Sequence, residues 1–155
     1  MKVSEIMIHS PQSCSSGMNL AKAVEKMWEV DCGILPVVDD GGKVIGMITD
    51  RDICVALGTR NLLASDMTVG QVTSGKVAGC SPEDDIHSAL NVMKSQRRLP
   101  VLDGDVRLQG ILCMDDIVMR ARPDGKELSY KHVVETLKEI YRHVKREPAP
   151  RDVAA

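Results

Sequence analysis

The strongest constraint on this chain is an internal repeat. The stretch from Leu35 to Ile53 reads LPVVDDGGKVIGMITDRDI, and the stretch from Leu99 to Ile117 reads LPVLDGDVRLQGILCMDDI. The two stretches align without gaps at an offset of 64 residues, and 7 of their 19 positions are identical, where average composition predicts about one. Each copy is therefore one supersecondary unit that the chain uses twice.

The repeat continues upstream of these stretches, at an offset of 66 residues. Apolar residues at helical spacing recur there: Leu20, Ala23, Val24 and Met27 correspond to Ile86, Ala89, Leu90 and Met93. Each set predicts one amphipathic helix, with Asn19 and Asp85 as the N-caps. A buried strand, a turn and a second strand follow each helix, so each unit also contains a β-hairpin.

The size of the unit predicts how the two copies are arranged. A unit of about sixty residues is too small to bury a large core alone, so we expect two halves of one module packed about a pseudo-twofold axis. We predict a first unit over 1–62 and a second unit over 66–122. A C-terminal amphipathic helix over 127–147, capped by Ser129, and a disordered tail over 148–155 should follow.

The second helix of each unit is apolar on more than one side. This holds for Ile53–Leu57 in the first unit and for Ile117–Met119 in the second. A helix of this kind has no single buried face. We expect one side to cover its own sheet and the other to contact a second copy, which gives a homodimer. The alternative is that both sides are buried within one chain.

Composition excludes several classes of function. A net charge of −2 and an aromatic content of 2% disfavour nucleic-acid binding. The chain has neither a membrane-spanning apolar run nor a signal peptide, so we expect a cytoplasmic protein.

The 5 cysteines form no CxxC and the 4 histidines are scattered, so we expect reduced thiols and no metal site. No catalytic motif is present, which predicts no enzymatic activity and no catalytic cofactor.

The sharpest local signal is Thr49-Asp50-Arg51-Asp52, where a strand meets a helix. A hydroxyl and free amides at a helix start can hold an anion, and a carboxylate three residues later can accept both hydroxyls of a ribose. The alternative is a capping box, in which Thr49 and Asp52 satisfy the free amides of the helix themselves. The second copy has Cys113 in place of the threonine but keeps Asp116. A purely structural cap would need that aspartate less, which favours a ligand.

These motifs resemble a tandem pair of cystathionine-β-synthase (CBS) domains. The similarity rests on LPVVD, GMITDRDI and their second copies RRLPVLD and GIL, and covers residues 1–122. It implies a mixed α/β fold of two β-α-β-β-α units. It also implies a regulatory module that binds AMP, ADP, ATP or S-adenosylmethionine between the units and modulates a partner protein. A ligand-free dimerisation scaffold is the alternative.

The resemblance also implies the site residues. A better site is expected at Thr49, Arg51, Asp52, Gly79, Gln96, Arg97 and Arg98. A weaker site is expected at Ser13, Cys32, Gly33, Ile34 and Asp116. The ranking follows from Cys113, which lacks the hydroxyl that helps to hold a phosphate.

Overall fold

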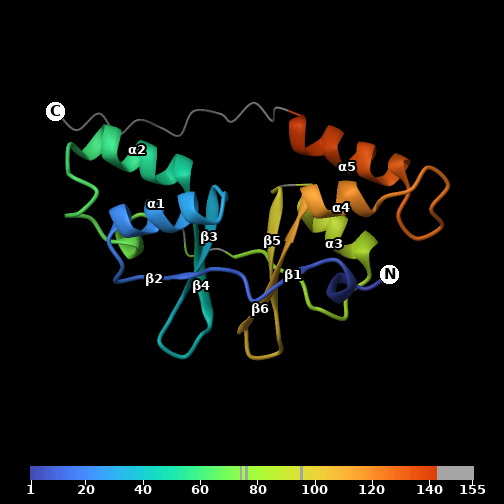
Figure 1. Cartoon of the computed structure of the whole chain (residues 1–155), viewed down its shortest axis with the longest axis horizontal. Helices are drawn as coiled ribbons and strands as arrows, with labels where there is room; N and C mark the ends of the chain where they lie inside the picture. The colour runs from blue at the N-terminus through green and yellow to red at the C-terminus, as the bar shows by residue number, and fades with distance from the viewer. Residues whose placement is uncertain (74, 76, 95, 143–155) are drawn as a thin grey trace.

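The computed structural model describes residues 1–73, 75, 77–94 and 96–142, which form two halves that lie side by side (Figure 1). Each half contains a three-stranded sheet, in the order β2-β3-β4 in the first half and β1-β6-β5 in the second. The strands are β1 Ile8–His9, β2 Cys14–Ser15, β3 Ile34–Val38, β4 Val44–Thr49, β5 Arg98–Leu102 and β6 Leu108–Cys113.

Helices cover these sheets in both halves (Figure 1). The predicted mixed α/β pair of units is confirmed, with a C-terminal helix packed on the second half. The α-helices are α1 Leu20–Glu29, α2 Asp50–Arg60, α3 Ile86–Met93, α4 Met114–Arg120 and α5 Tyr130–Tyr141, and the 3-10 helices are η1 Val3–Glu5 and η2 Val69–Gln71.

Three predicted N-caps are confirmed. The side chain of Asn19 accepts a hydrogen bond from the amide of Lys22 at 2.9 Å, and Asp85 accepts one from His87 at 2.9 Å. Ser129 caps α5. The predicted end of the last helix and the predicted disordered tail over 148–155 lie outside the described residues.

The segment that leads into each repeat packs in the core of the other half. Val3 and Ile6 belong to the core that contains Ile86 and the β5-β6 sheet. Met67 and Val69 belong to the core of the first half. The backbone bonds follow the repeat, because the amide of Ile86 donates to Met1 at 3.0 Å and the amide of Leu20 donates to Met67 at 2.9 Å. Strand β1 continues the exchange, because it pairs with β6 of the second sheet.

The two hairpin turns contact each other at the end of the molecule away from the helices (Figure 1). The amide of Val44 donates to the carbonyl of Val106 at 3.0 Å, and Lys43 and Arg107 form an antiparallel bridge. Gly42 and Val106 occupy equivalent positions in the two turns and are both left-handed, with φ of 77° and 65°. Glycine adopts this conformation freely, whereas a β-branched residue is strained in it.

We predict that Val106→Gly increases the free energy of unfolding by about 1 kcal/mol, because relief of the left-handed strain exceeds the entropy lost with glycine. Gly42→Val should decrease the same quantity by about 1–2 kcal/mol. An added Cβ at Gly42 meets no atom within 4 Å, so this cost comes from the backbone. Urea denaturation measures both changes. Gly104→Ala is the matched control, and equal effects of all three substitutions would contradict the prediction.

Candidate functional site

The start of helix α2 is a closed capping box. The hydroxyl of Thr49 accepts a hydrogen bond from the amide of Asp52 at 3.1 Å and donates to its Oδ2 at 2.7 Å. The amide of Thr49 donates to the same Oδ2 at 3.0 Å. One carboxylate oxygen of Asp52 is therefore already bonded within the protein, as the structural alternative for this motif predicts.

The start of helix α4 differs because a thiol replaces the hydroxyl. Cys113 occupies the N-cap position and makes no side-chain cap. The Oδ2 of Asp116 is buried and has no hydrogen-bond partner among the residues that the structure describes. Burial also raises the pKa of the Cys113 thiol, despite the nearby Arg98 guanidinium, so the thiol stays neutral. A buried carboxylate oxygen without a donor is costly, which makes Asp116 a candidate to receive hydrogen bonds from a ligand.

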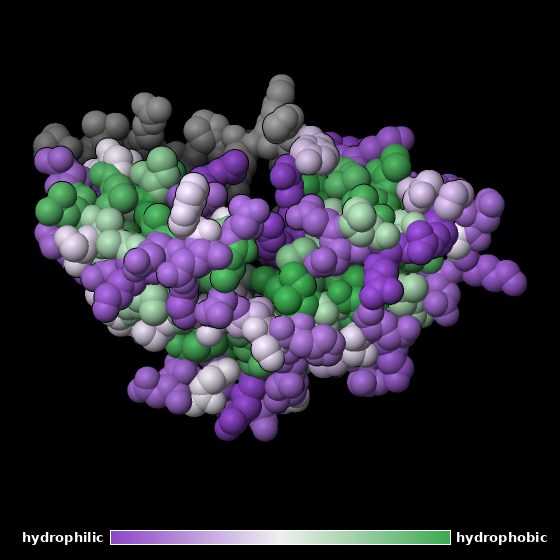
Figure 2. Space-filling model, in the orientation of Figure 1, coloured by the Kyte–Doolittle hydropathy of each residue, from purple (hydrophilic) through white to green (hydrophobic). Residues whose placement is uncertain are grey.

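Asp116 lines a cleft of about 360 Å³ between the two halves, which we call the Asp116 cleft. Figure 2 shows the surface hollowed where the halves meet. Its walls are mainly apolar, and its volume lies within the range of roughly 300–1,000 Å³ that is typical of small-molecule sites. The lining residues are Ile8, Ser10, Pro11, Gln12, Val30, Asp31, Cys32, Ile34, Leu35, Arg98, Ile111, Cys113, Asp115 and Asp116.

A second, more open hollow of about 560 Å³ lies at the start of α2, and we call it the Thr49 cleft. Residues from both halves line it: Gly33, Ile34, Thr49, Asp50, Arg51, Gln96, Arg97, Arg98 and Ile140. Arg97 also stacks on the ring of Tyr141 from α5, with 4.6 Å between the guanidinium carbon and the ring centroid. The C-terminal helix therefore supplies part of the wall of this cleft.

The structure brings together most of the residues expected at the better site. Thr49, Arg51, Gln96, Arg97 and Arg98 all line the Thr49 cleft. The other two expected residues lie outside its described lining. Asp52 bonds to Thr49 instead. Gly79 packs against β5, where an added Cβ would lie 2.9 Å from the carbonyl oxygen of Pro100.

The residues expected at the weaker site are divided between the two clefts. Cys32, Ile34 and Asp116 line the Asp116 cleft, whereas Gly33 lines the Thr49 cleft. Ser13 lies outside the described lining of both clefts, and its carbonyl accepts a hydrogen bond from Lys26 Nζ at 2.8 Å.

Several residues of the Asp116 cleft were not predicted from the sequence. Ile8 and Pro11 reach it because the chain crosses from the second half to the first between β1 and β2 (Figure 1). Asp31 follows the end of α1 and has a left-handed φ of 48°. Asp115 pairs with Arg98 at 3.7 Å. The DD pair at 115–116 was visible in the sequence, but the approach of the crossing segment depends on tertiary packing alone.

The described parts of the chain contain no group of three or more His, Cys, Asp and Glu side chains arranged to hold a metal ion. Within the same residues, no helix has the length and apolar character needed to cross a bilayer.

A family model described as the CBS domain matches this chain twice, over residues 3–59 and 69–122. The hypoxic response protein 1 of Mycobacterium tuberculosis is 34% identical over 100 residues, which cover 63% of this chain and 69% of that protein. An uncharacterized 17.7 kDa protein of Acidianus ambivalens is 29% identical over 139 residues, which cover 88% of this chain and 82% of that protein.

The chain also matches part of a longer enzyme and almost the whole of a solved CBS domain pair. The homoserine O-acetyltransferase of Methanohalobium evestigatum is 30% identical over 74% of this chain, but the chain spans only 23% of that enzyme. The CBS domain pair of protein MJ0100, solved in complex with 5′-methylthioadenosine and S-adenosyl-L-methionine, superposes with a TM-score of 0.69 at 25% identity. The superposition covers 77% of this chain and 98% of that one.

We predict that the difference between the two helix starts follows from one hydroxyl. Cys113→Thr should supply the missing donor to Asp116 and increase the free energy of unfolding by about 1 kcal/mol. The reciprocal change, Thr49→Cys, should decrease it by a similar amount. Thermal and urea denaturation of both variants measure the effects. Destabilisation by Cys113→Thr would show that Asp116 is satisfied in another way.

Proposed function

The chain belongs to the CBS domain family, and on that premise we propose that it is a non-catalytic regulatory module. It binds an adenosine-type ligand between its two CBS units and thereby modulates a partner protein. The enzymes that match this chain do so over a small part of their own length, as the 23% coverage of the acetyltransferase illustrates. That limited coverage supports a regulatory role for the shared part, without catalysis by it.

The observation that carries the proposal is Asp116, which lines the Asp116 cleft and whose buried Oδ2 has no hydrogen-bond partner among the described residues. A ribose offers two adjacent hydroxyl donors, and a carboxylate is the side chain that accepts both. The apolar side chains of Ile8, Ile34 and Ile111 provide surfaces on which a purine can pack. The ligands present in the MJ0100 structure are also adenosine derivatives.

This proposal places the main site in the Asp116 cleft, whereas the sequence ranks the Thr49 cleft first. Two features support the change. The Asp116 cleft is the more enclosed of the two. Asp52 lies outside the described lining of the Thr49 cleft, and its Oδ2 is already bonded to Thr49.

Binding in this cleft connects the two halves. Ile34 belongs to the first half, and Ile111 and Asp116 belong to the second. A ligand that contacts both sides favours the arrangement in which both contacts form. A partner protein that contacts both halves would respond to that shift, since a ligand regulates only through its different affinities for two states.

Isothermal titration with adenosine, 5′-methylthioadenosine, S-adenosylmethionine, AMP and ATP tests the proposal. We predict that at least one of them binds, and that Asp116→Ala weakens its binding at least tenfold because the ribose hydroxyls lose their acceptor. Asp52→Ala is the matched control and should change the affinity less than threefold. Loss of binding in Asp52→Ala alone would assign the ligand to the Thr49 cleft. Absence of binding by all five compounds at millimolar concentration would leave the ligand-free scaffold.

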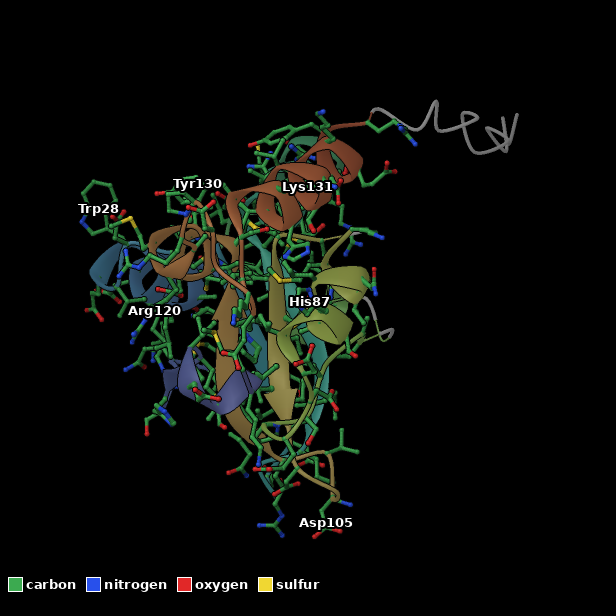
Figure 3. All side chains as sticks on the ribbon, turned by 90° about the vertical axis from the view of Figure 1, so that its right-hand side faces the viewer. Trp28, His87, Asp105, Arg120, Tyr130 and Lys131 are labelled. Atoms are coloured by element: carbon green, nitrogen blue, oxygen red, sulfur yellow. The ribbon has the colours of Figure 1, made fainter. Side chains whose placement is uncertain are left out.

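The module is also proposed to form a homodimer through the second helices of its two units. Val55 and Cys54 of α2 and Val118 and Met119 of α4 remain exposed, with Met119 at 79%. Trp28, which is 87% exposed, projects from α1 beside the groove between α1 and α2 (Figure 3). Apolar groups that remain exposed on α1, α2 and α4 support an interface there.

We predict that the double variant Val55→Glu, Met119→Glu is monomeric, because burial of two carboxylates at an apolar interface is unfavourable. Light scattering after size exclusion measures the mass. Ile45→Glu, on strand β4 and away from these helices, is the control and should leave the dimer intact. A monomeric wild-type chain at micromolar concentration would contradict this part of the proposal.

A further inference from the structure

The two clefts carry opposite charge, although they share Arg98 and Ile34. The described lining of the Thr49 cleft contains Arg51, Arg97 and Arg98 and one carboxylate, that of Asp50, which gives a formal charge of +2. Among the described residues that line the Asp116 cleft, three carry carboxylates and one, Arg98, carries a guanidinium, which gives a formal charge of −2. Those carboxylates belong to Asp31, Asp115 and Asp116.

The one positive side chain in the described lining of the Asp116 cleft, that of Arg98, is already engaged. The Nη2 of Arg98 lies 3.7 Å from Oδ2 of Asp115. Its guanidinium also interacts with the Cys113 thiol. An anionic ligand group in this cleft would have to compete with Asp115 for the guanidinium, while it is repelled by the two other carboxylates.

The start of α4 offers an anion little compensation. The N-cap is Cys113, which provides no hydroxyl donor. Asp115 and Asp116 occupy the first turn, where their negative charges offset the partial positive charge of the free amides. The wall of the cleft is instead uncharged and polarisable here, because the Cys113 sulfur and the side chains of Ile8 and Ile111 form it.

We propose that the Asp116 cleft is selective for adenosine derivatives whose 5′ substituent is neutral or positively charged, such as a thioether or a sulfonium, and discriminates against 5′-phosphates. This inference rests on the proposed function and names the ligand class of its main site. Asp116 accepts the ribose hydroxyls, and Asp31 and Asp115 set the charge that the 5′ substituent meets. At pH 7 a phosphate monoester carries about −1.5 to −2 charges, so this repulsion acts on every nucleotide.

Competition titrations that report on this cleft test the selectivity. Bound adenosine is displaced with 5′-methylthioadenosine or with AMP, and only the signal that disappears in Asp116→Ala is assigned to the cleft. We expect 5′-methylthioadenosine to compete at least fivefold better than AMP. Raising NaCl from about 50 to 500 mM should improve competition by AMP, because salt screens repulsion between like charges. Equal competition by the two compounds, or competition by AMP that weakens with salt, would overturn the inference.

A double variant and a matched control separate the effect of the cleft's negative charge from the effect of its shape. Asp31→Asn with Asp115→Asn removes two negative charges with little change of shape, and asparagine suits the left-handed conformation at position 31. The preference for the thioether should fall below twofold in this double variant. Asp105→Asn, at the distant hairpin turn (Figure 3), is the control and should retain the preference. An unchanged preference in the double variant would also overturn the inference.

The outcomes separate this inference from the proposed function. If adenosine itself does not bind, the proposed function fails. If adenosine binds in a manner that depends on Asp116 but AMP competes as well as the thioether, only the selectivity fails.

Discussion

The exchange of lead-in segments is the constraint on which the rest of the structure depends. The core of the second half is incomplete without Val3 and Ile6, and the core of the first half is incomplete without Met67 and Val69. Because each half buries the lead-in of the other, the two cannot separate without exposing apolar side chains to water. The clefts therefore lie between parts that are held together by their own cores. The crossing chain between β1 and β2 also supplies a wall of the Asp116 cleft.

Within this symmetric frame, one substitution makes the two clefts chemically different. Threonine at position 49 closes a capping box and occupies an oxygen of Asp52. Cysteine at position 113 cannot do so, and Oδ2 of Asp116 is left buried without a partner among the described residues. A folded protein keeps such a group where something else compensates for its cost. In our proposal, the ribose of an adenosine derivative provides that compensation.

The sequence predicted the elements of each unit well because the signals were local and occurred twice. Both predicted amphipathic helices are present, one with the stripe from Leu20 to Met27 and the other with its copy from Ile86 to Met93. Their N-caps are Asn19 and Asp85, as predicted. The sequence analysis also predicts one site that contains Arg51, Arg97 and Arg98, and these three residues line one cleft. Their ranking above the Asp116 cleft remains untested.

Other features had no local signal. Nothing in VSEIM at 3–7 indicates that it packs with the second half, because this preference arises from long-range contacts with residues such as Ile86. Ile8, Pro11 and Asp31 reach the Asp116 cleft only through that packing. The sequence shows the loss of a hydroxyl at Cys113 and predicts weaker phosphate binding from it, but it does not indicate that Oδ2 of Asp116 becomes buried. The structure shows that Oδ2 of Asp116 also lacks a donor among the residues that it describes.

A crystal structure of the chain grown with adenosine tests the central claim most directly. Our account predicts density for the nucleoside in the Asp116 cleft, with a ribose hydroxyl within hydrogen-bond distance of Asp116 and the capping box of Thr49 and Asp52 intact. Density for the nucleoside only in the Thr49 cleft, or an empty Asp116 cleft in which a protein group donates to Asp116, would contradict it.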